Sequence, residues 1–292
     1  MSVETIKPKI AISGGLVRVA KIQSEYYMPL QDPSAFVDEV RQSRIKADIF
    51  SFVQPRFETA PKYPYHYEFD SISVLPISTY DHWWTKQIND KTRNMVRRAK
   101  KNGTEIRVVD FNDDLVKGIK GIYDEVQIVQ GQKNRHYGKS VQTLKNEHSS
   151  FVERSQFLAA FFEEKLIGFA KVTFTNDRGV LMNIAGMNCH RDKAPSNALL
   201  AKVVEICAER GIPYLQYGVW SKRGLGNFKK HHAFERLDIP RYFVPLTLRG
   251  RIALSMKLHR NWKQYIPESL MDFVIEMRSK WRSHTVQKQL PT

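Results

Sequence analysis

Residues 213–234 read PYLQYGVWSKRGLGNFKKHHAF. This stretch predicts a short strand, a turn that contains Gly218, and a basic helix whose N-terminus carries free backbone N–H groups. Just upstream, residues 191–197 read RDKAPSN and open a second helix in the same way. Both transitions bring cations to a helix N-terminus, where backbone amides and the helix dipole favour anions. The pattern indicates an anion-binding crevice, which is typical of an enzyme that uses a phosphorylated carrier.

The composition is that of a globular and strongly basic protein. The chain has 292 residues, of which 42% are hydrophobic and 11% aromatic, and its formal net charge is +16. This hydrophobic content excludes a disordered chain. The charge predicts a polyanionic partner, which could be a nucleic acid, a phosphorylated cofactor or an anionic membrane surface. A soluble protein that is basic without such a partner is the alternative.

Cysteine usage and hydropathy exclude several classes of protein. The two cysteines, Cys189 and Cys207, have no C-x-x-C spacing, which argues against a disulfide framework and a structural zinc site, and no metal is expected. The N-terminus lacks the apolar run of a signal peptide. No window reaches the roughly 18 consecutive apolar residues that span a bilayer. We therefore expect a cytoplasmic protein without a transmembrane segment.

The order of expected elements predicts a mixed sheet flanked by helices, in an α/β or α+β layer architecture. Upstream, the patterns predict a helix over 33–46, strands over 47–53 and 69–75, a basic helix over 79–101 and a strand over 104–109. The basic helix has either a solvated charged face or a cradle for a phosphate-bearing ligand. Downstream, the patterns predict helices over 113–130 and 140–155, strands over 157–163, 166–175 and 180–187, a helix over 197–210, a strand over 214–220, a helix over 225–232 and a strand over 236–246.

The tail changes character after residue 247. Residues 248–259 and 269–281 predict two basic amphipathic helices. Such helices either pack their apolar face on the parent domain or lie on a membrane surface. Peripheral contact with the inner membrane face is therefore a second expectation for localisation.

The loop after the strand at 180–187 carries a family resemblance. Its sequence, Arg191-Asp-Lys-Ala194-Pro-Ser196, is similar to the [Gln/Arg]-x-x-Gly-x-[Gly/Ala] loop with which GNAT acyltransferases hold the pyrophosphate of coenzyme A. The arginine is in place, and Ala194 and Ser196 stand at the positions of the small residues. The resemblance implies a GNAT-like fold with a mixed, mostly antiparallel sheet, and acyl-CoA, in particular acetyl-CoA, as cosubstrate.

Three further segments resemble the FemAB-like branch of this superfamily. They are the basic run 91–103, the run 123–138 (YDEVQIVQGQKNRHYG), and Tyr217-Gly-Val219 followed by Phe228-Lys229. The resemblance covers about residues 45–247. It implies a partial N-terminal FemAB-like half at 1–110 that includes the basic helix, a GNAT-like domain at 111–247, and C-terminal helices at 248–292. Lys229 departs from the pattern, because GNAT enzymes place a tyrosine acid there.

The resemblance and the residue chemistry together suggest site residues. The expected cofactor-binding residues are Gly186, Arg191, Lys193, Ala194, Ser196, Asn197, Lys222 and Asn227. Gly186 allows a bulge near the amide that polarises the carbonyl, and the others supply cations or helix N-terminal amides. The expected catalytic residues are His136, Tyr137, Tyr217 and Lys229. His136 is either a general base or a solvent-exposed loop histidine, and Tyr217 is either catalytic or a packed aromatic.

The leading hypothesis is an N-acyltransferase that moves an acyl group from acyl-CoA to an amine of a sugar, peptide or small molecule. Direct attack in a ternary complex requires no covalent nucleophile. The FemAB-like relatives imply aminoacyl transfer from charged tRNA as an alternative. A third possibility, from a different class, is a non-catalytic binder of nucleic acid or membrane surfaces on a decayed acyltransferase fold.

Overall fold

The structure, a computed structural model, describes residues 8–259 except 24, 26–29, 44, 56, 130, 131, 176 and 222. It divides into two compact units. Of the described residues, the first contains those in 8–73, Val219–Ser221 and 236–259, and the second contains those in Val74–Gly218 and 223–235. The basic helix therefore belongs to the second unit. The three-part division expected from the sequence stays a prediction about independently folding parts.

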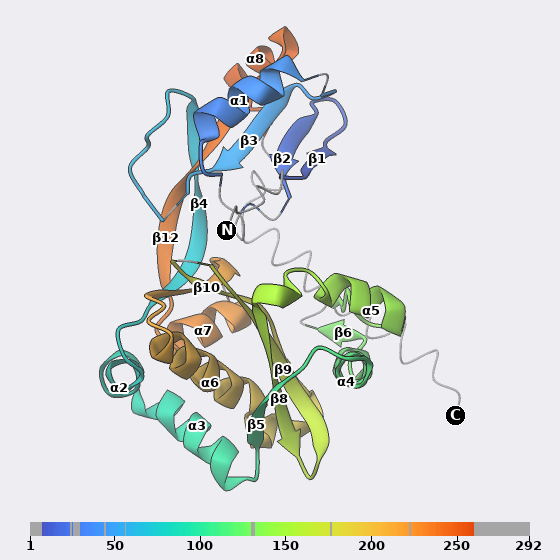
Figure 1. Cartoon of the computed structure of the whole chain (residues 1–292), viewed down its shortest axis with the longest axis vertical. Coiled ribbons are helices and arrows are strands. Elements are labelled where there is room, and N and C mark those ends of the chain that lie inside the picture. Colours follow the sequence, from blue (N-terminus) through green and yellow to red (C-terminus); the bar gives the residue numbers. More distant parts are fainter. Residues whose placement is uncertain are drawn as a thin grey trace. The chain divides into compact units, whose positions relative to one another are not determined.

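The first unit is built on five strands (Figure 1). In sheet order they are β1 (Ile10–Ser13), β2 (Val19–Ile22), β3 (Ile49–Val53), β12 (Glu235–Pro245) and β4 (His66–Pro76). The pairs β1–β2 and β3–β12 are antiparallel, and β2–β3 is parallel. The sheet of this unit is thus mixed.

Alternation along β3 assigns one helix to each face of this sheet. Phe50 and Phe52 belong to a buried cluster with Val37 of α1 (Pro33–Gln42), whereas Ile49 lies in a separate cluster with Ala253 of α8 (Leu248–Ser255). The helix α1 begins at Asp32, whose carboxylate accepts a hydrogen bond from the amide of Ala35 at 3.0 Å. This confirms the cap expected from the sequence.

The second unit carries the sheet that the sequence predicted most regularly. Its strands in order are β11 (Tyr214–Val219), β10 (Gly179–Gly186), β9 (Lys165–Phe174), β8 (Ser155–Phe162) and β5 (Glu105–Val109). Only β10 and β11 run parallel, and the other three pairs are antiparallel. The predicted α/β class with a mixed, mostly antiparallel sheet is confirmed.

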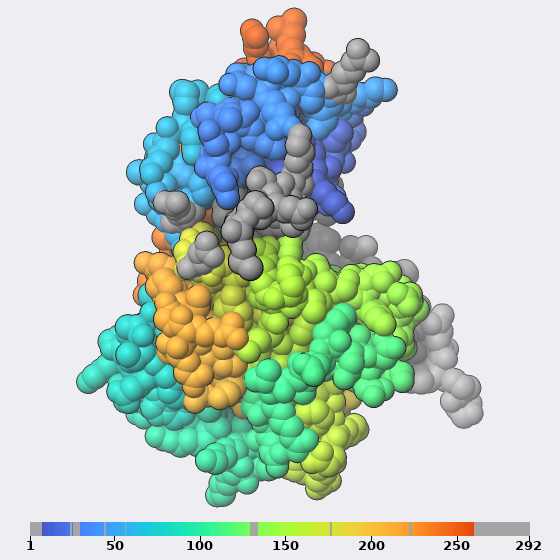
Figure 2. Space-filling view, in the orientation of Figure 1, coloured from blue at the N-terminus to red at the C-terminus, as the bar shows by residue number. Residues whose placement is uncertain are grey.

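Helices cover both faces of this second sheet. On one face, α6 (Pro195–Glu209) and α3 (Asp90–Lys101) pack near Leu158 and Ala170. On the other face, α4 (Asp113–Asp124) and α5 (Val141–His148) enclose Phe157 and Phe169 (Figure 1). Figure 2 shows α4 and α5, drawn in green, at the surface of this unit. The alternation of Phe157 and Leu158 explains why the sheet is buried on both sides.

The basic helix expected at 79–101 is interrupted. The structure has α2 (Tyr80–His82), a π-helical turn η1 (Trp83–Gln87) and then α3. The new start follows from Asn89, whose side chain accepts from the amide of Thr92 at 2.9 Å. The Arg93 guanidinium donates to the carbonyl oxygens of Ile88 at 2.6 Å and Trp84 at 2.8 Å. One of the predicted surface cations is thus used to close the preceding turn.

The helix expected at 113–130 is also shorter than predicted. The side-chain amide of Asn134 donates to the carbonyl oxygens of Tyr123 at 2.9 Å and Val126 at 3.1 Å, which satisfies the end of α4 from outside the helix. A two-stranded hairpin follows, formed by β6 (Ile128–Val129) and β7 (Gln132–Lys133). Helix periodicity could not predict this end, because it depends on a contact between Tyr123 and a residue eleven positions downstream.

The tail is described only in part. The first expected helix exists as α8, and the second, at 269–281, lies outside the described residues. The exposed side chains of α8 include Leu248 and Ile252, so membrane contact there stays a prediction. Among the described residues, no helix has the length and apolar character required to cross a membrane.

Candidate functional site

The loop predicted to bind phosphate connects β10 to α6. It contains the short 3-10 helix η3 (Asn188–Lys193), followed by Ala194 at the N-cap of α6. Ala194 is buried and has φ of 46°, in the left-handed region that favours glycine. Ser196 and Asn197 lie in the first turn of α6, and the amide of Asn197 donates to the carbonyl oxygen of Ala194 at 3.1 Å.

The strand end and the helix start approach each other closely at Gly186. A Cβ atom there would lie 2.7 Å from Cγ of Pro195 and 3.0 Å from Oγ of Ser196. A proline ring has little freedom to move aside. Glycine is therefore required here for close packing rather than for the bulge that the sequence suggested, since the register shift of β10 lies between Leu181 and Asn183.

Replacing Gly186 by alanine is expected to destabilise the protein by about 1–3 kcal/mol, because the added methyl overpacks the start of α6. The displaced first turn is also expected to weaken donor binding. Gly121→Ala is the matched control, since a Cβ at this position of α4 meets nothing within 4 Å. That variant is expected to be stabilised by about 0.5–1 kcal/mol. Urea unfolding of both variants checks the pair, and equal effects would contradict the close approach.

Glu125, just beyond α4, holds the beginning of η3. Its carboxylate accepts from the amides of Asn188 at 2.6 Å and Cys189 at 2.7 Å. Burial acts to raise the pKa of Glu125, but the hydrogen bonds from Cys189 and Asn188 outweigh it and hold this pKa below its ordinary value. These two amides are occupied by the protein's own anion, so a donor phosphate would meet the later part of the loop. Sequence reasoning missed this role, although Glu125 lies within the 123–138 run.

The basic helix α3 is joined to the same loop. Beyond its C-terminus, the side chain of Asn102 donates to the carbonyl oxygen of Asp192 at 2.9 Å, and Thr104 donates to that of Lys193 at 2.8 Å. The Lys193 ammonium lies 4.1 Å from the centre of the Phe162 ring and 3.5 Å from the Asp192 carboxylate. Exposed cations of α3 and the loop are Lys91, Arg97, Arg98, Lys100, Lys101 and Arg191. The exposed cations agree with the expected solvated face of the helix, and the phosphate cradle stays a prediction.

The strands β10 and β11 pair over a short distance only. Within the described residues their register contains two pairs, Gly179 with Leu215 and Val180 with Gln216. Beyond them β10 shifts its register against β9 between Leu181 and Asn183. The rest of β10 therefore has backbone amides on its β11 side that are not used in this pairing. An amide near Ala185, where the sequence placed the polarising group, is on this stretch.

Tyr217 and Lys229 form a buried pair beside this stretch. The Lys229 ammonium lies 4.6 Å from the centre of the Tyr217 ring. Lys229 belongs to α7 (Arg223–His231), and its side chain is 1% exposed. Burial lowers the pKa of Lys229 to about 8 and raises the pKa of Tyr217 to about 12. A lysine of this kind can exchange a proton near neutral pH.

His136 stacks on Tyr123, to which sequence reasoning had not assigned a role. The two ring centroids lie 4.3 Å apart. Burial raises the pKa of Tyr123, and the electrostatic effect of Tyr217 acts in the same direction. The imidazole of His136 therefore has an aromatic and largely buried neighbour.

The geometry of His136 limits its use as a base. Burial, together with the charges of Arg135 and Lys139, lowers the pKa of His136 below its ordinary value. Its Nε2 atom accepts a hydrogen bond from Arg135 at 2.9 Å, and its Nδ1 atom lies 3.8 Å from the Glu147 carboxylate. The ring is therefore neutral at pH 7, but its acceptor nitrogen is engaged.

The remaining candidates are peripheral in this structure or outside its described part. Tyr137 is 38% exposed on the turn that follows β7. Asn227 is exposed on α7. Lys222 lies outside the described residues. The structure brings the loop residues 191–197 together in one segment and places Lys229 against Tyr217, whereas the described contacts of the His136 ring are with Tyr123, Arg135 and Glu147.

Comparison with known proteins identifies the fold. No family model matches the chain, and no curated protein matches it. Among solved structures, FemX is similar with a TM-score of 0.59 and 10% identity over 85% of this chain and 86% of that one. The L-PGS structure from Bacillus licheniformis has a TM-score of 0.56 and 14% identity over 85% of each chain.

A third solved structure agrees with these two. The C-terminal domain of a putative lysylphosphatidylglycerol synthetase from Agrobacterium fabrum has a TM-score of 0.56 and 12% identity over 84% of this chain and 83% of that one. The chain therefore shares the fold of FemX and of these two structures, as the FemAB-like resemblance implied. At these identities the likeness concerns the fold alone.

Proposed function

We propose that this protein is a transferase that moves an acyl or aminoacyl group from a phosphate-bearing donor to an amine. The observation that carries the proposal is the buried Tyr217–Lys229 pair, together with the part of β10 that lies beyond its pairing with β11. Acyl transfer needs a polarised carbonyl and a leaving group that receives a proton. The acceptor nitrogen attacks the carbonyl carbon directly, and the bond to the carrier's sulfur or oxygen breaks.

We assign the roles as follows. Arg191 and Lys193 hold the donor phosphates with their side-chain cations, and Ser196 and Asn197 add their polar side chains at the N-terminus of α6. An amide of β10 near Ala185 receives the carbonyl oxygen. The Lys229 ammonium gives its proton to the leaving group, because its pKa of about 8 suits an acid at neutral pH. His136 takes the amine proton at its Nε2 atom, and only after the hydrogen bond that Arg135 donates to this atom is broken.

The leading donor in this proposal is acyl-CoA, in particular acetyl-CoA. The loop at 191–197 supports it, since the arginine and the small residues stand where a pyrophosphate-binding loop requires them. Ala194 already has the left-handed conformation that such a loop uses.

Aminoacyl-tRNA is the second candidate donor, favoured by a different observation. Exposed cations lie along α3, and the residues that follow this helix are hydrogen-bonded to the loop. Together with the net charge of +16, they suit a long polyanion better than a single cofactor.

Titrations of the full chain with acetyl-CoA and with tRNA, read by calorimetry and thermal shift, test both donors. With tRNA as donor, Lys100→Ala together with Lys101→Ala is expected to reduce the salt slope of log K by about 1–2. Lys46→Ala, a surface cation of the first unit, is the control.

The outcome of these titrations decides between acyl-CoA and tRNA as donor, and between a transferase and a non-catalytic binder. Stabilisation by tRNA alone would reject acyl-CoA as donor, and stabilisation by acetyl-CoA alone would reject tRNA. Salt-dependent binding without turnover toward any amine would reject a transferase and support a non-catalytic binder. Turnover assays with amine-bearing sugars, peptides and lipid vesicles then identify the acceptor, including one at a membrane surface.

A further inference from the structure

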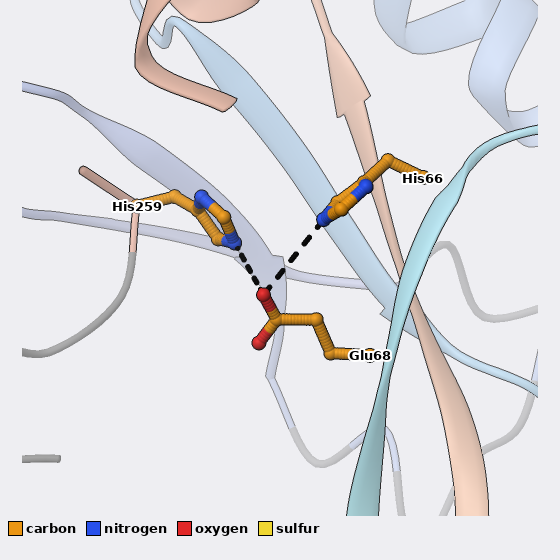
Figure 3. Close-up of side chains that lie close together, drawn as sticks. All are labelled: His66, Glu68 and His259. Carbon is orange, nitrogen blue, oxygen red and sulfur yellow. Dashed lines mark hydrogen bonds and ion pairs between the residues drawn. The ribbon is translucent and has the colours of Figure 1, made fainter. Parts of the chain in front are cut away.

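Three metal-ligating side chains of the first unit meet outside the proposed transfer site. Nε2 of His259 lies 2.9 Å from Oε1 of Glu68, and Nε2 of His66 lies 3.7 Å from the same oxygen. The three ligand atoms all lie within 4.8 Å of one another. Figure 3 shows both rings directed at the same carboxylate oxygen of Glu68.

The local structure explains why these residues meet. His66 and Glu68 are two residues apart on β4, so their side chains leave the same face of the strand. His259 follows the end of α8, where Lys257 has a left-handed φ of 57°. The amide of Leu258 donates to the carbonyl oxygen of Ala253 at 2.8 Å, and that of Lys257 to Leu254 at 3.0 Å. This is the hydrogen-bond pattern of a Schellman motif, which turns the chain sharply after the helix.

The cluster of His66, Glu68 and His259 is buried at His259 and exposed to solvent at His66. The His259 side chain is 0% exposed, that of Glu68 is 22% exposed, and that of His66 is 44% exposed. The Phe243 ring forms an apolar wall, with its centroid 4.6 Å from that of His259 and 6.1 Å from that of His66. The buried Nδ1 of His259 has no hydrogen-bond partner among the described residues. The contact at Nε2 therefore orients this ring.

We propose that His66, Glu68 and His259 bind a divalent transition-metal ion of the zinc class. Such an ion takes imidazole nitrogen and carboxylate oxygen at about 2.0–2.2 Å, so ligand atoms around a tetrahedral centre lie about 3.3–3.6 Å apart. The observed 2.9 Å and 3.7 Å bracket this separation. Three protein ligands leave one position on the open side, next to His66. Calcium and magnesium fit poorly, because they select oxygen ligands.

An ordinary hydrogen bond between His259 and Glu68 is the competing explanation. It accounts for the short contact, but it gives no reason for a second imidazole nitrogen beside the same carboxylate oxygen. The bound ion would join the segment after α8 to β4. Because it would bind the folded unit and not the unfolded chain, it would stabilise this unit as its concentration rises.

The test uses the tag-free full chain after dialysis against EDTA, with zinc chloride and cobalt chloride as probes. One zinc ion per chain is expected by calorimetry, and cobalt is expected to give the visible absorption of a four-coordinate N/O site. Glu68→Gln, His66→Asn and His259→Asn are each expected to weaken zinc binding at least tenfold. His82→Asn, an exposed histidine of the second unit, is the control.

Thermal unfolding gives an independent readout. The midpoint of the wild-type chain is expected to rise with zinc concentration, and that of Glu68→Gln is expected to respond less. Since His259 is buried and its variant could fail to fold, Glu68→Gln and His66→Asn decide the matter on their own. Wild-type zinc affinity no tighter than that of these two variants would overturn the proposal, as would a weakening that His82→Asn reproduces.

Discussion

Lys229→Met is expected to lose about 10²–10³-fold in kcat while the protein becomes more stable at neutral pH. The loss follows if the buried ammonium protonates the leaving group, because a positioned general acid contributes at about this level. The gain in stability follows from burial, which disfavours the charged amine and lowers its pKa to about 8. Steady-state kinetics with the identified donor measures the first effect, and urea unfolding measures the second.

The pH dependence of Lys229→Met separates the two effects. The ordinary pKa of this lysine is 10.5, so between pH 8 and 10.5 the unfolded chain binds more protons than the folded one. The unfavourable burial of charge is therefore fully present below pH 8 and disappears as the pH rises to 10.5. The stability advantage of Lys229→Met over the wild type is expected to shrink across that window. The wild-type kcat is expected to fall above pH 8 as Lys229 loses its proton. The kcat of the variant is expected not to show this fall.

Lys230→Met is the matched control, since Lys230 is the next residue of the same helix and is exposed. It is expected to keep its kcat and to show no stability gain of this kind. Full activity of Lys229→Met would mean that the buried lysine has no part in transfer. A loss of activity accompanied by lower stability would instead indicate damaged packing.

Arg241→Met is expected to destabilise the first unit by about 3–5 kcal/mol. Arg241 is 7% exposed, and its guanidinium donates to Asp70 at 2.7 Å and Glu25 at 2.5 Å. Burial raises the pKa of Glu25, and Arg241 opposes that shift. Removing the guanidinium from this buried ionic group leaves the two carboxylates with less compensation for their burial, which is the reason for the large effect.

The comparison for this prediction is Arg236→Met. Arg236 is 53% exposed and pairs with Asp238 at 2.9 Å, so its loss is expected to change stability by less than about 1 kcal/mol. Combining Arg241→Met with Glu25→Gln is expected to recover part of the loss, because one buried charge is removed with its partner. Unfolding by urea measures all three variants. Equal effects of Arg241→Met and Arg236→Met would contradict the buried network.

Local patterns in the sequence predicted most of the strands and helices. The element boundaries that were predicted wrongly depend on contacts between residues that are not neighbours in the sequence. The strand at 180–187 and the helix at 197–210 were predicted within two residues, because alternation and helical periodicity are properties of neighbouring positions. The early end of α4 depends on Asn134, and the break before α3 depends on where the Arg93 side chain donates. Neither contact leaves a periodic signal.

The residues of the candidate site also divide into those predictable from local sequence and those that depend on contacts between distant segments. Arg191 through Asn197 could be named from the sequence, because they form one continuous loop. Lys229 stood out as a departure from a pattern, but its contact with Tyr217 depends on how α7 packs against β11. Glu125 reaches its partners across 63 residues. The cluster of His66, Glu68 and His259 joins residues 191 positions apart, which no spacing rule predicts.

The carboxylate of Glu125 also has a kinetic consequence. Since it satisfies the amides of Asn188 and Cys189, the start of the loop is ordered before any donor arrives. A preformed site avoids the entropy of ordering a loop on binding. Donor association is then expected to proceed in one step at a rate close to that of diffusive encounter, and donors of different affinity are expected to differ in residence time rather than in how fast they arrive.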